Sequence, residues 1–174
     1  MEVDKAIKER HSVRNYSPKA VKLVDVVTIV NAGRFAPAAG NIPTVRFIIV
    51  NDKEKKKKLA DAALGQHFIA TAQYVIAICS DFTQLVRAYG NRGLIYARQQ
   101  AGAAIQNMLL KAVDLGLSSC WTGAFDDETV KKILKIPKDV NVEALLPIGY
   151  SNGGKVMRKK PDLDKITYLN FWKK

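Results

Sequence analysis

The sequence predicts an α+β fold, because helical and extended patterns are mixed along the chain without a strict β-α-β repeat. Three apolar runs rich in β-branched residues, at residues 45–51, 73–80 and 142–150, are typical of strands. The longest helical pattern covers residues 95–115 and has a wide apolar face. No internal repeat or linker divides the 174 residues, so we expect residues 1–174 to form one domain with its own core.

The N-terminal third predicts two helices separated by a connector. Residues 2–9 have a short helical pattern, and a polar connector follows over residues 10–18. Residues 22–34 predict a second helix, since apolar side chains recur there at helical spacing: Leu23, Val26, Val27 and Val30. The small residues and prolines of segment 35–43 then predict a loop.

The middle of the chain predicts two strands with a helix between them. Residues 45–51 and 73–80 are the strands, and the second is apolar enough to be covered on both faces. Residues 53–64, rich in Lys and Ala, predict the helix, and the pattern over residues 82–89 is ambiguous. The helix over residues 95–115 should be buried on most sides by its apolar residues: Ala101, Ala104, Ile105, Met108, Leu109 and Ala112.

The last third begins where Gly116 ends the long helix. Residues 118–122 predict a short strand, and Asp126 or Asp127 can cap a helix over residues 128–135. The apolar run at residues 142–150 completes the main body.

The chain is basic, with 28 Lys and Arg against 16 Asp and Glu and a net charge of +12. Such a charge can favour nucleic acids, because Lys and Arg neutralise phosphates. Much of the excess lies in two lysine-rich runs, residues 53–58 and 155–160, and a charge run that begins a helix is typical of a solvated face. We find no basic stripe interleaved with aromatic residues and no nucleic-acid module signature, so we expect no nucleic-acid partner.

The sequence gives no sign of a membrane or secretory role. No uninterrupted apolar stretch is long enough to cross a bilayer, and the first ten residues alternate charged with apolar side chains. We therefore expect a cytoplasmic protein without a membrane partner.

Few side chains could carry metal or nucleophilic chemistry. Cys79 and Cys120 lie far apart in apolar runs, which indicates two buried thiols. His11 and His67 are the two histidines, so a metal site with several imidazoles cannot form, and no G-x-S-x-G motif presents a serine nucleophile. A redox reaction would therefore need a bound cofactor.

The connector at residues 10–14, Arg-His-Ser-Val-Arg, is suited to hold a phosphate group. Arg10 and Arg14 can form paired hydrogen bonds with phosphate oxygens, and Ser12 adds a hydroxyl group. A solvated turn with unrelated surface arginines is the alternative, and these five residues alone leave both interpretations open.

Three further segments are suited to contact a ligand. Small residues at 36–41 let the backbone approach a planar ring, and Asn41 offers both donors and an acceptor. The glycine turn within residues 119–126 can point backbone N–H groups at a ligand, and the basic residues 155–161 suit an anion. The alternatives are a plain helix-ending loop, a turn whose aromatic residues belong to the core, and a solvated charge run.

Together and in this order, the segments resemble the FMN-dependent nitroreductase family. Residues 10–14 resemble its R-R/H-S-x-R segment after a short helix, and residues 36–41 resemble its A-P-S-A-G-N loop, with Ala38 where Ser is common. Residues 106–112 resemble its central helix of the q-n-l-l-L-A-A type, and residues 116–123 resemble G-L-G-S-C-W-x-G. A P-x-G-Y strand with a basic tail completes a set that covers nearly the whole chain.

The resemblance implies a fold, an assembly and an activity. The fold would be α+β, with a mostly antiparallel central sheet flanked by helices, in an intertwined homodimer with two FMN sites at the interface. Electrons would pass from NAD(P)H through FMN to a small acceptor, such as a nitroaromatic or a quinone, by a ping-pong mechanism without a metal. A dehalogenating or flavin-fragmenting enzyme on the same scaffold is one alternative. A non-catalytic basic protein that binds anions or nucleic acid is the other.

The resemblance also assigns the residues that contact FMN. The connector and the basic tail would hold the phosphate end, the loop at residues 36–41 would line the ring from the partner subunit, and Thr122 and Gly123 would approach its N5/O4 side. Arg14 would lie near the N1/O2 edge, where its charge stabilises the reduced ring. The complete implied set is Arg10, His11, Ser12, Arg14, Pro37, Ala38, Ala39, Asn41, Gln66, Thr122, Gly123, Arg158 and Lys159.

The C-terminal segment, residues 151–174, ends in side chains too apolar to remain in solvent: Ile166, Tyr168, Leu169, Phe171 and Trp172. We expect this segment to pack on the partner subunit as an arm. Folding back onto its own subunit is the alternative.

Overall fold

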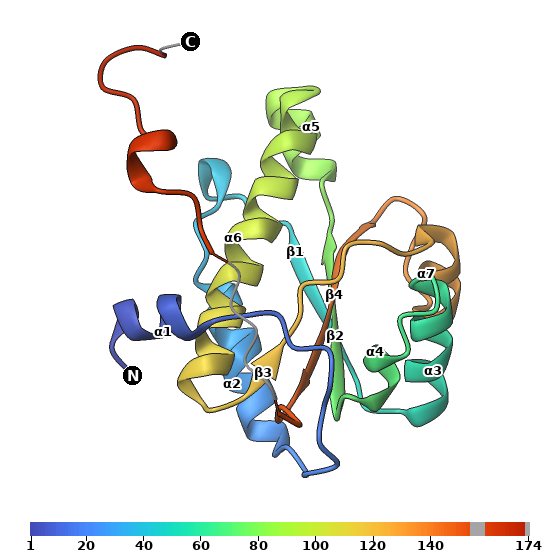
Figure 1. The fold of residues 1–174 in the computed structure, drawn as a ribbon. Helices are drawn as coiled ribbons and strands as arrows, with labels where there is room; N and C mark the ends of the chain where they lie inside the picture. Colours follow the sequence, from blue (N-terminus) through green and yellow to red (C-terminus); the bar gives the residue numbers. More distant parts are fainter. Residues whose placement is uncertain (154–158, 173–174) are drawn as a thin grey trace.

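A four-stranded antiparallel sheet lies between two layers of helices in the computed structural model, which describes residues 1–153 and 159–172 (Figure 1). The strands follow the order β1-β2-β4-β3, and every neighbouring pair is antiparallel. Their bounds are β1 Val45–Val50, β2 Tyr74–Ser80, β3 Ser118–Ser119 and β4 Asn141–Gly149. The structure confirms the α+β prediction, including the mostly antiparallel sheet.

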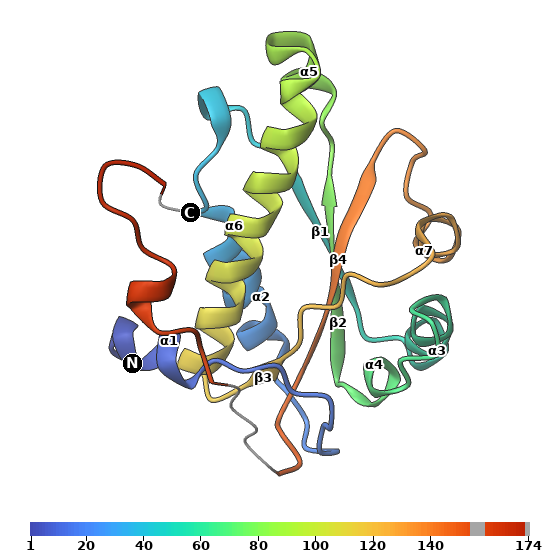
Figure 2. The ribbon, with the colours of Figure 1, turned by 45° about the horizontal axis from the view of Figure 1, so that its top comes forward.

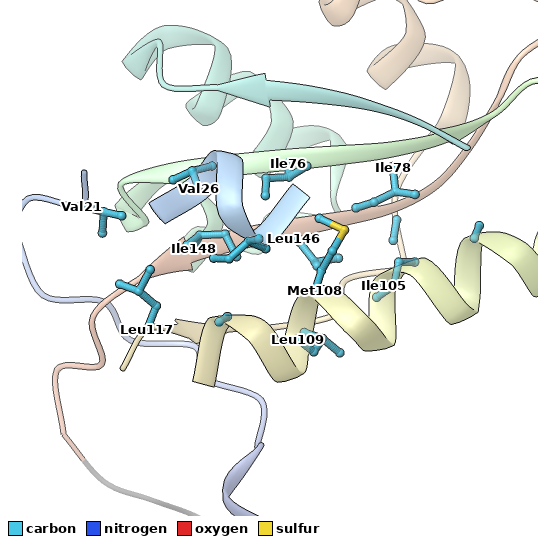
Figure 3. Packing of buried hydrophobic residues seen from close by; sticks show 14 residues of the cluster. Val21, Val26, Ile76, Ile78, Ile105, Met108, Leu109, Leu117, Leu146 and Ile148 are labelled. Atoms are coloured by element: carbon cyan, nitrogen blue, oxygen red, sulfur yellow. The ribbon is translucent and has the colours of Figure 1, made fainter. Parts of the chain in front are cut away.

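One face of the sheet is covered by α2 (Leu23–Arg34) and α6 (Arg92–Asp114), and α1 (Val3–Glu9) packs on α6. Figure 3 shows the core beneath them, in which Ile105 and Met108 of α6 pack toward strand residues such as Ile76. All six apolar residues expected to bury α6 are buried, so this prediction is confirmed. Each large apolar side chain removed from water in this way contributes about 1.5–3 kcal/mol.

The other face is covered by α3 (Lys53–Ala62), α4 (Phe68–Thr71) and α7 (Asp127–Leu134), as Figure 2 shows on the far side of the strands. Alternate residues of β2 point to opposite faces, so Val75, Ala77 and Cys79 pack against this second layer. The expectation that β2 is covered on both faces is therefore confirmed.

Two helices begin at aspartate caps. The carboxylate of Asp126 accepts a hydrogen bond from the backbone N–H of Thr129 at 2.8 Å, as the sequence predicted for one of two aspartates. Asp52 caps α3 in the same way, with its carboxylate 2.7 Å from the backbone nitrogen of Lys55. Gly116, at φ +70°, follows the end of α6 in the left-handed conformation that suits glycine.

The apolar face predicted for α2 is partly wrong. Leu23 and Val27 are exposed, whereas Val26, Ile29 and Gly33 are buried. Gly33 explains the rotation, since a Cβ there would lie 2.9 Å from the Met108 side chain. A face that includes a glycine lets α2 approach α6 closely, and this leaves Leu23 and Val27 on the outside.

The lysine run at the start of α3 was predicted to face solvent, but one of its residues is buried. Lys56 is buried, and its Nζ donates to the carbonyl oxygens of Ala72 at 2.6 Å and Gln73 at 3.1 Å. Burial lowers the pKa of this amine. Lys56 therefore joins α3 to the residues that precede β2, while its neighbours in the run face solvent.

Three boundaries differ from the sequence expectations. The ambiguous segment contains a helix, α5 (Thr83–Tyr89), and α6 begins at Arg92, three residues before the predicted start. The predicted strand at residues 118–122 is regular only in β3 and then continues as an isolated bridge between Thr122 and Leu145. Short 3-10 turns, Ala39–Asn41 and Leu163–Lys165, complete the elements.

Gly93 allows α5 and α6 to meet at a sharp corner, and its replacement should be costly. A Cβ at Gly93 would lie 2.4 Å from the carbonyl oxygen of Leu85, which is backbone and cannot rotate away. We expect Gly93→Ala to lower the free energy of unfolding by about 1–3 kcal/mol. Urea denaturation of the variant and the wild type measures the difference.

Gly102→Ala on the same helix is the matched control for Gly93→Ala. Its Cβ would lie 3.7 Å from the Trp121 ring, an ordinary van der Waals contact. Since alanine suits a helix interior better than glycine, we expect stabilisation of about 0.5–1 kcal/mol. Equal unfolding midpoints for the two variants would contradict this account of the corner.

Candidate functional site

The N-terminal connector is not a free turn, because it is hydrogen-bonded along the edge of the sheet. The backbone nitrogen of Val13 lies 3.0 Å from Ser119 O, and that of Ser17 lies 2.9 Å from Tyr150 O. Ser12 forms a parallel bridge with Ser119. These contacts hold the backbone while the side chains of Ser12 and Arg14 remain exposed to solvent.

Tyr16 anchors this connector, and sequence reasoning missed it. Its hydroxyl oxygen lies 2.8 Å from Val13 O and 3.2 Å from Pro147 O, and the ring packs so closely on Gly149 that a Cβ there would be 2.9 Å away. Burial raises the pKa of Tyr16 far above its ordinary value, so the hydroxyl stays a neutral donor. The one available signal was an aromatic side chain within a polar segment.

Arg10 and His11 lie where α1 ends. Arg10 is the C-cap residue, half-buried, and its backbone nitrogen donates to Ala6 O at 3.0 Å. His11 turns back to the helix, with Nδ1 2.8 Å from Glu9 O. Arg10, Ser12 and Arg14 thus start from a fixed backbone, which lowers the conformational cost of binding an anion.

Thr122 and Gly123 form the second part of the site. The backbone of Thr122 pairs with Leu145 in both directions, at 3.1 and 2.9 Å, and this holds the side chain inside the protein. Thr122 Oγ1 is buried and has no hydrogen-bond partner among the described residues. A buried hydroxyl without a partner costs about 1–3 kcal/mol, so this atom suits a ligand that supplies one. Gly123 beside it is exposed, and space is open where its Cβ would be.

Gln66 joins the α3–α4 turn to the turn after β3. Its Nε2 donates to Ala63 O at 2.9 Å and to Ala124 O at 3.1 Å. The guanidinium carbon of Arg14 lies 5.9 Å from the ring centroid of Phe68, the first residue of α4. The connector, the α3–α4 turn and the segment after β3 are therefore adjacent. The segments that carry Arg14, Gln66, Thr122 and Gly123 thus lie close to one another.

Trp121 is 44% exposed, so the alternative that made it a core residue is wrong. Phe125, by contrast, is partly buried against the core that lies beneath α3 and α7.

Both cysteines are buried and free, which confirms that expectation, and burial raises the pKa of Cys79 to about 11. A thiol held in its neutral form is a weak nucleophile.

One loop of the predicted site lies far from the connector within the same subunit. It contains Pro37, Ala38, Ala39 and Asn41. It is held near the N-terminal half of α6, where Thr44 Oγ1 is 3.1 Å from Gln100 Oε1. The segment before the connector reaches the far end of this helix, where the Met1 amino group is 2.5 Å from Asp114. Fourteen residues of helix separate Gln100 from Asp114, about 21 Å along the axis. One subunit therefore does not bring this loop to the connector.

The basic tail starts beside the connector. The backbone nitrogen of Asn152 lies 3.0 Å from Asn15 O, and Tyr16 forms an antiparallel bridge with Ser151. Arg158 lies outside the described residues, and Lys159 is exposed. The two ends of the chain thus meet at the connector, although the contact of Lys159 with phosphate stays a prediction.

Within residues 1–153 and 159–172, no three His, Cys, Asp or Glu side chains are grouped so that they could bind a metal ion. No helix in the same ranges has the length and apolar character needed to span a membrane.

Comparison with known proteins shows the family of this chain. The model of the Nitroreductase family matches residues 7–78 and 63–150, which is most of the chain. This chain belongs to the nitroreductase family. The resemblance drawn from its short motifs is therefore confirmed, and so is the nitroreductase fold.

Two relatives and one solved structure illustrate the family. A protein of Archaeoglobus fulgidus, provisionally named an NADH dehydrogenase/NAD(P)H nitroreductase, is 31% identical over 150 residues, with 84% of this chain and 83% of the relative aligned. The FMN reductase [NAD(P)H] of Bacillus subtilis is 29% identical over 189 residues, covering 97% and 75%. The structure of NfrA1 from B. megaterium superposes with a TM-score of 0.91 at 25% identity, covering 98% and 75%.

Proposed function

We propose that this nitroreductase is an NAD(P)H-dependent FMN oxidoreductase that reduces a small acceptor such as a nitroaromatic or a quinone. The observation that carries the proposal is the fixed Arg10–Arg14 connector beside a turn whose buried Thr122 hydroxyl has no hydrogen-bond partner among the described residues. An FMN reductase among the relatives supports the same cofactor and donor. Family membership favours this enzyme over a basic protein without catalytic activity.

The residues present fit FMN at both ends. Arg10 and Ser12 offer a cation and a hydroxyl to the phosphate, and Lys159 in the basic tail follows the segment that starts at the same connector. Thr122 Oγ1 and the open backbone at Gly123 offer hydrogen-bonding groups to the edge of the ring. Bound FMN would supply a centre that accepts a hydride from a nicotinamide and passes electrons on.

The protein's own residues position the ring and balance its charge. Arg14, exposed and placed beside Phe68, would face the N1/O2 edge and stabilise the negative charge that reduction places there. No side chain has to act as a nucleophile. Donor and acceptor would use the same open site in turn, in a ping-pong mechanism. We place this activity in the cytoplasm, where nicotinamide cofactors are available.

A homodimer would complete the site. Both α1 and α2 carry exposed apolar side chains that a second copy would cover: Val3, Ile7, Leu23, Val24 and Val27, each 49–67% exposed. The loop that contains Pro37 and Asn41 is too far along α6 to reach the connector of its own subunit. In a dimer, the loop of one subunit would line the ring bound at the connector of the other.

Colour and reduction test the proposed function. The purified protein should be yellow or should take up added FMN, and NADH or NADPH should bleach its absorbance in the absence of oxygen. Addition of a nitroaromatic or a quinone should then restore the absorbance. A colourless protein that takes up no FMN would overturn the proposal, and a yellow protein that neither nicotinamide bleaches would overturn its electron donor.

A further inference from the structure

Gln100 of α6 holds the end of the loop at residues 36–43, which contains Pro37, Ala38, Ala39 and Asn41. The side chain is 5% exposed, and its Oε1 accepts from the backbone nitrogen of Thr44 at 3.3 Å and from Thr44 Oγ1 at 3.1 Å. Thr44 itself is buried, and its carbonyl oxygen accepts from the backbone nitrogen of Asp81 at 2.9 Å. The exit of the loop is therefore fixed to both the long helix and the sheet.

The other half of the same amide is unused. The backbone N–H of Thr44 can only donate, so it requires the oxygen of Gln100 and fixes which way the amide faces. Gln100 Nε2 is then left buried and without a hydrogen-bond partner among the described residues. Because an unpaired buried donor is unfavourable, this atom would gain from an acceptor that moved within its reach.

The loop itself offers the acceptor. Gln100 lines a small cavity of about 70 Å³ together with Ala36, Pro37, Ala38 and Pro43. The carbonyl oxygens of Ala36 and Pro37 accept no hydrogen bond from the described residues, whereas those of Ala38 and Ala39 accept from Asn41 and Ile42. Closure of this cavity would bring a free carbonyl oxygen toward the free amide nitrogen.

Tyr89 packs against the tip of the loop at Gly40. Its hydroxyl lies so close to Gly40 that a Cβ there would be 2.3 Å away, and Gly40 has a φ of +56°. Tyr89 in turn packs edge-on against Tyr96 of α6, with ring centroids 5.3 Å apart. The tip of the loop is therefore supported by aromatic residues, and its first half, residues 36–38, is the part with space to move.

We propose that Gln100 is a positioning residue for this loop. Its Oε1 fixes the loop at Thr44, and its Nε2 donates to the carbonyl oxygen of Ala36 or Pro37 when the loop closes on the flavin ring. The inference rests on the proposed function, because it takes the loop as the wall of the FMN site. Gln100 would thus couple the shape of the pocket to the central helix without touching the cofactor.

Two substitutions separate the roles of the oxygen and the nitrogen. Gln100→Met removes both, so hydrogen exchange at the Thr44 N–H of the FMN-free protein should become about tenfold faster, and FMN should dissociate about tenfold faster. Gln100→Glu keeps an acceptor for Thr44 but loses the donor. Its Thr44 exchange should stay near the wild-type rate at neutral pH, while FMN dissociates faster.

The pH profile of Gln100→Glu gives a readout that loss of packing would not produce. Burial raises the pKa of a glutamate, and its protonated form regains an O–H donor. The ratio of the variant's FMN dissociation rate to that of the wild type should therefore fall toward one as the pH is lowered. A ratio that is independent of pH would overturn the role of the donor. Gln84→Met, which removes an exposed amide on α5, is the control.

Different results would overturn the role of Gln100 and the proposed function. Unchanged Thr44 exchange in Gln100→Met, or FMN release at the wild-type rate in both variants, overturns the role of Gln100 and leaves the flavoenzyme intact. A wild-type protein that takes up no FMN overturns the proposed function and with it the flavin half of the inference. If Gln100→Met does not fold, the measurements on Gln100→Glu decide.

Discussion

The variant Arg10→Ala is expected to bind FMN about ten- to a hundredfold more weakly than the wild type. A hydrogen bond between a guanidinium and a phosphate contributes about 1.5–3 kcal/mol, which corresponds to this loss. Arg10 is half-buried at the end of α1, so its charge is less screened than that of a free surface side chain. Titration of the apoprotein with FMN, followed by quenching of flavin fluorescence, measures the dissociation constant.

Arg10→Ala should leave the fold intact. Its backbone nitrogen donates to Ala6 O, and an alanine keeps that hydrogen bond. Within the described residues, the Arg10 side chain forms no ion pair that its removal would break. The unfolding midpoint of the FMN-free variant should therefore equal that of the wild type.

Riboflavin separates the phosphate contact from other causes of weaker binding. It has the same ring as FMN and no phosphate, so Arg10→Ala should bind it as the wild type does. Lys132→Ala is the control, because it makes the same change in net charge at an exposed residue of α7, across the sheet. It should leave FMN affinity unchanged. An equal loss of affinity for riboflavin and FMN would contradict the assignment of Arg10 to the phosphate.

Much of the fold could be predicted because its elements follow local rules. Helix α6 has apolar residues at a helical period, and every residue expected in its core is buried. The carboxylate of Asp126 caps α7 because a helix start requires an acceptor at that position. Strands β1, β2 and β4 are apolar runs bounded by polar residues or turns, and each was found within two residues of its predicted bounds.

The errors arise where distant parts of the chain decide the outcome. In α2, Leu23 and Val27 fit a helical period as well as Val26 does, and only the approach of Met108 to Gly33 selects the buried face. Lys56 is buried because the carbonyl oxygens before β2 lie within reach of its amine. Neither neighbour can be read from the local sequence.

In the candidate site, too, local residue types could be interpreted from the sequence, whereas contacts between distant residues could not. The segments were identified from their residue types, because arginine, glycine and small residues have direct chemical uses. The groups that hold those segments in place were missed, since Tyr16 and Gln100 act through contacts with residues 131 and 56 positions away. Short motifs therefore predicted the ligand-binding residues, and the structure was needed to find the residues that hold their segments in place.

Removal of residues 166–174 is expected to convert a dimer into a monomer that binds FMN weakly. In Figure 1 the C-terminal segment extends away from the body of its own chain. Leu169 and Trp172 are 82% and 76% exposed. Burial of such side chains on a partner would contribute about 1.5–3 kcal/mol each. Light scattering after size-exclusion chromatography gives the mass of the truncated protein, and flavin absorbance gives its FMN content.

A shorter truncation separates the apolar side chains from the terminal charges. Removal of Lys173 and Lys174 alone keeps the aromatic pair Tyr168 and Trp172, whose ring centroids are 4.4 Å apart, and should leave a yellow dimer. If the longer truncation also remains dimeric and yellow, the segment is not an arm. The exposed faces of α1 and α2 would then have to hold the subunits together by themselves. Because the arm and these faces would both lie on the partner, loss of the arm should reduce dimer affinity and FMN affinity together.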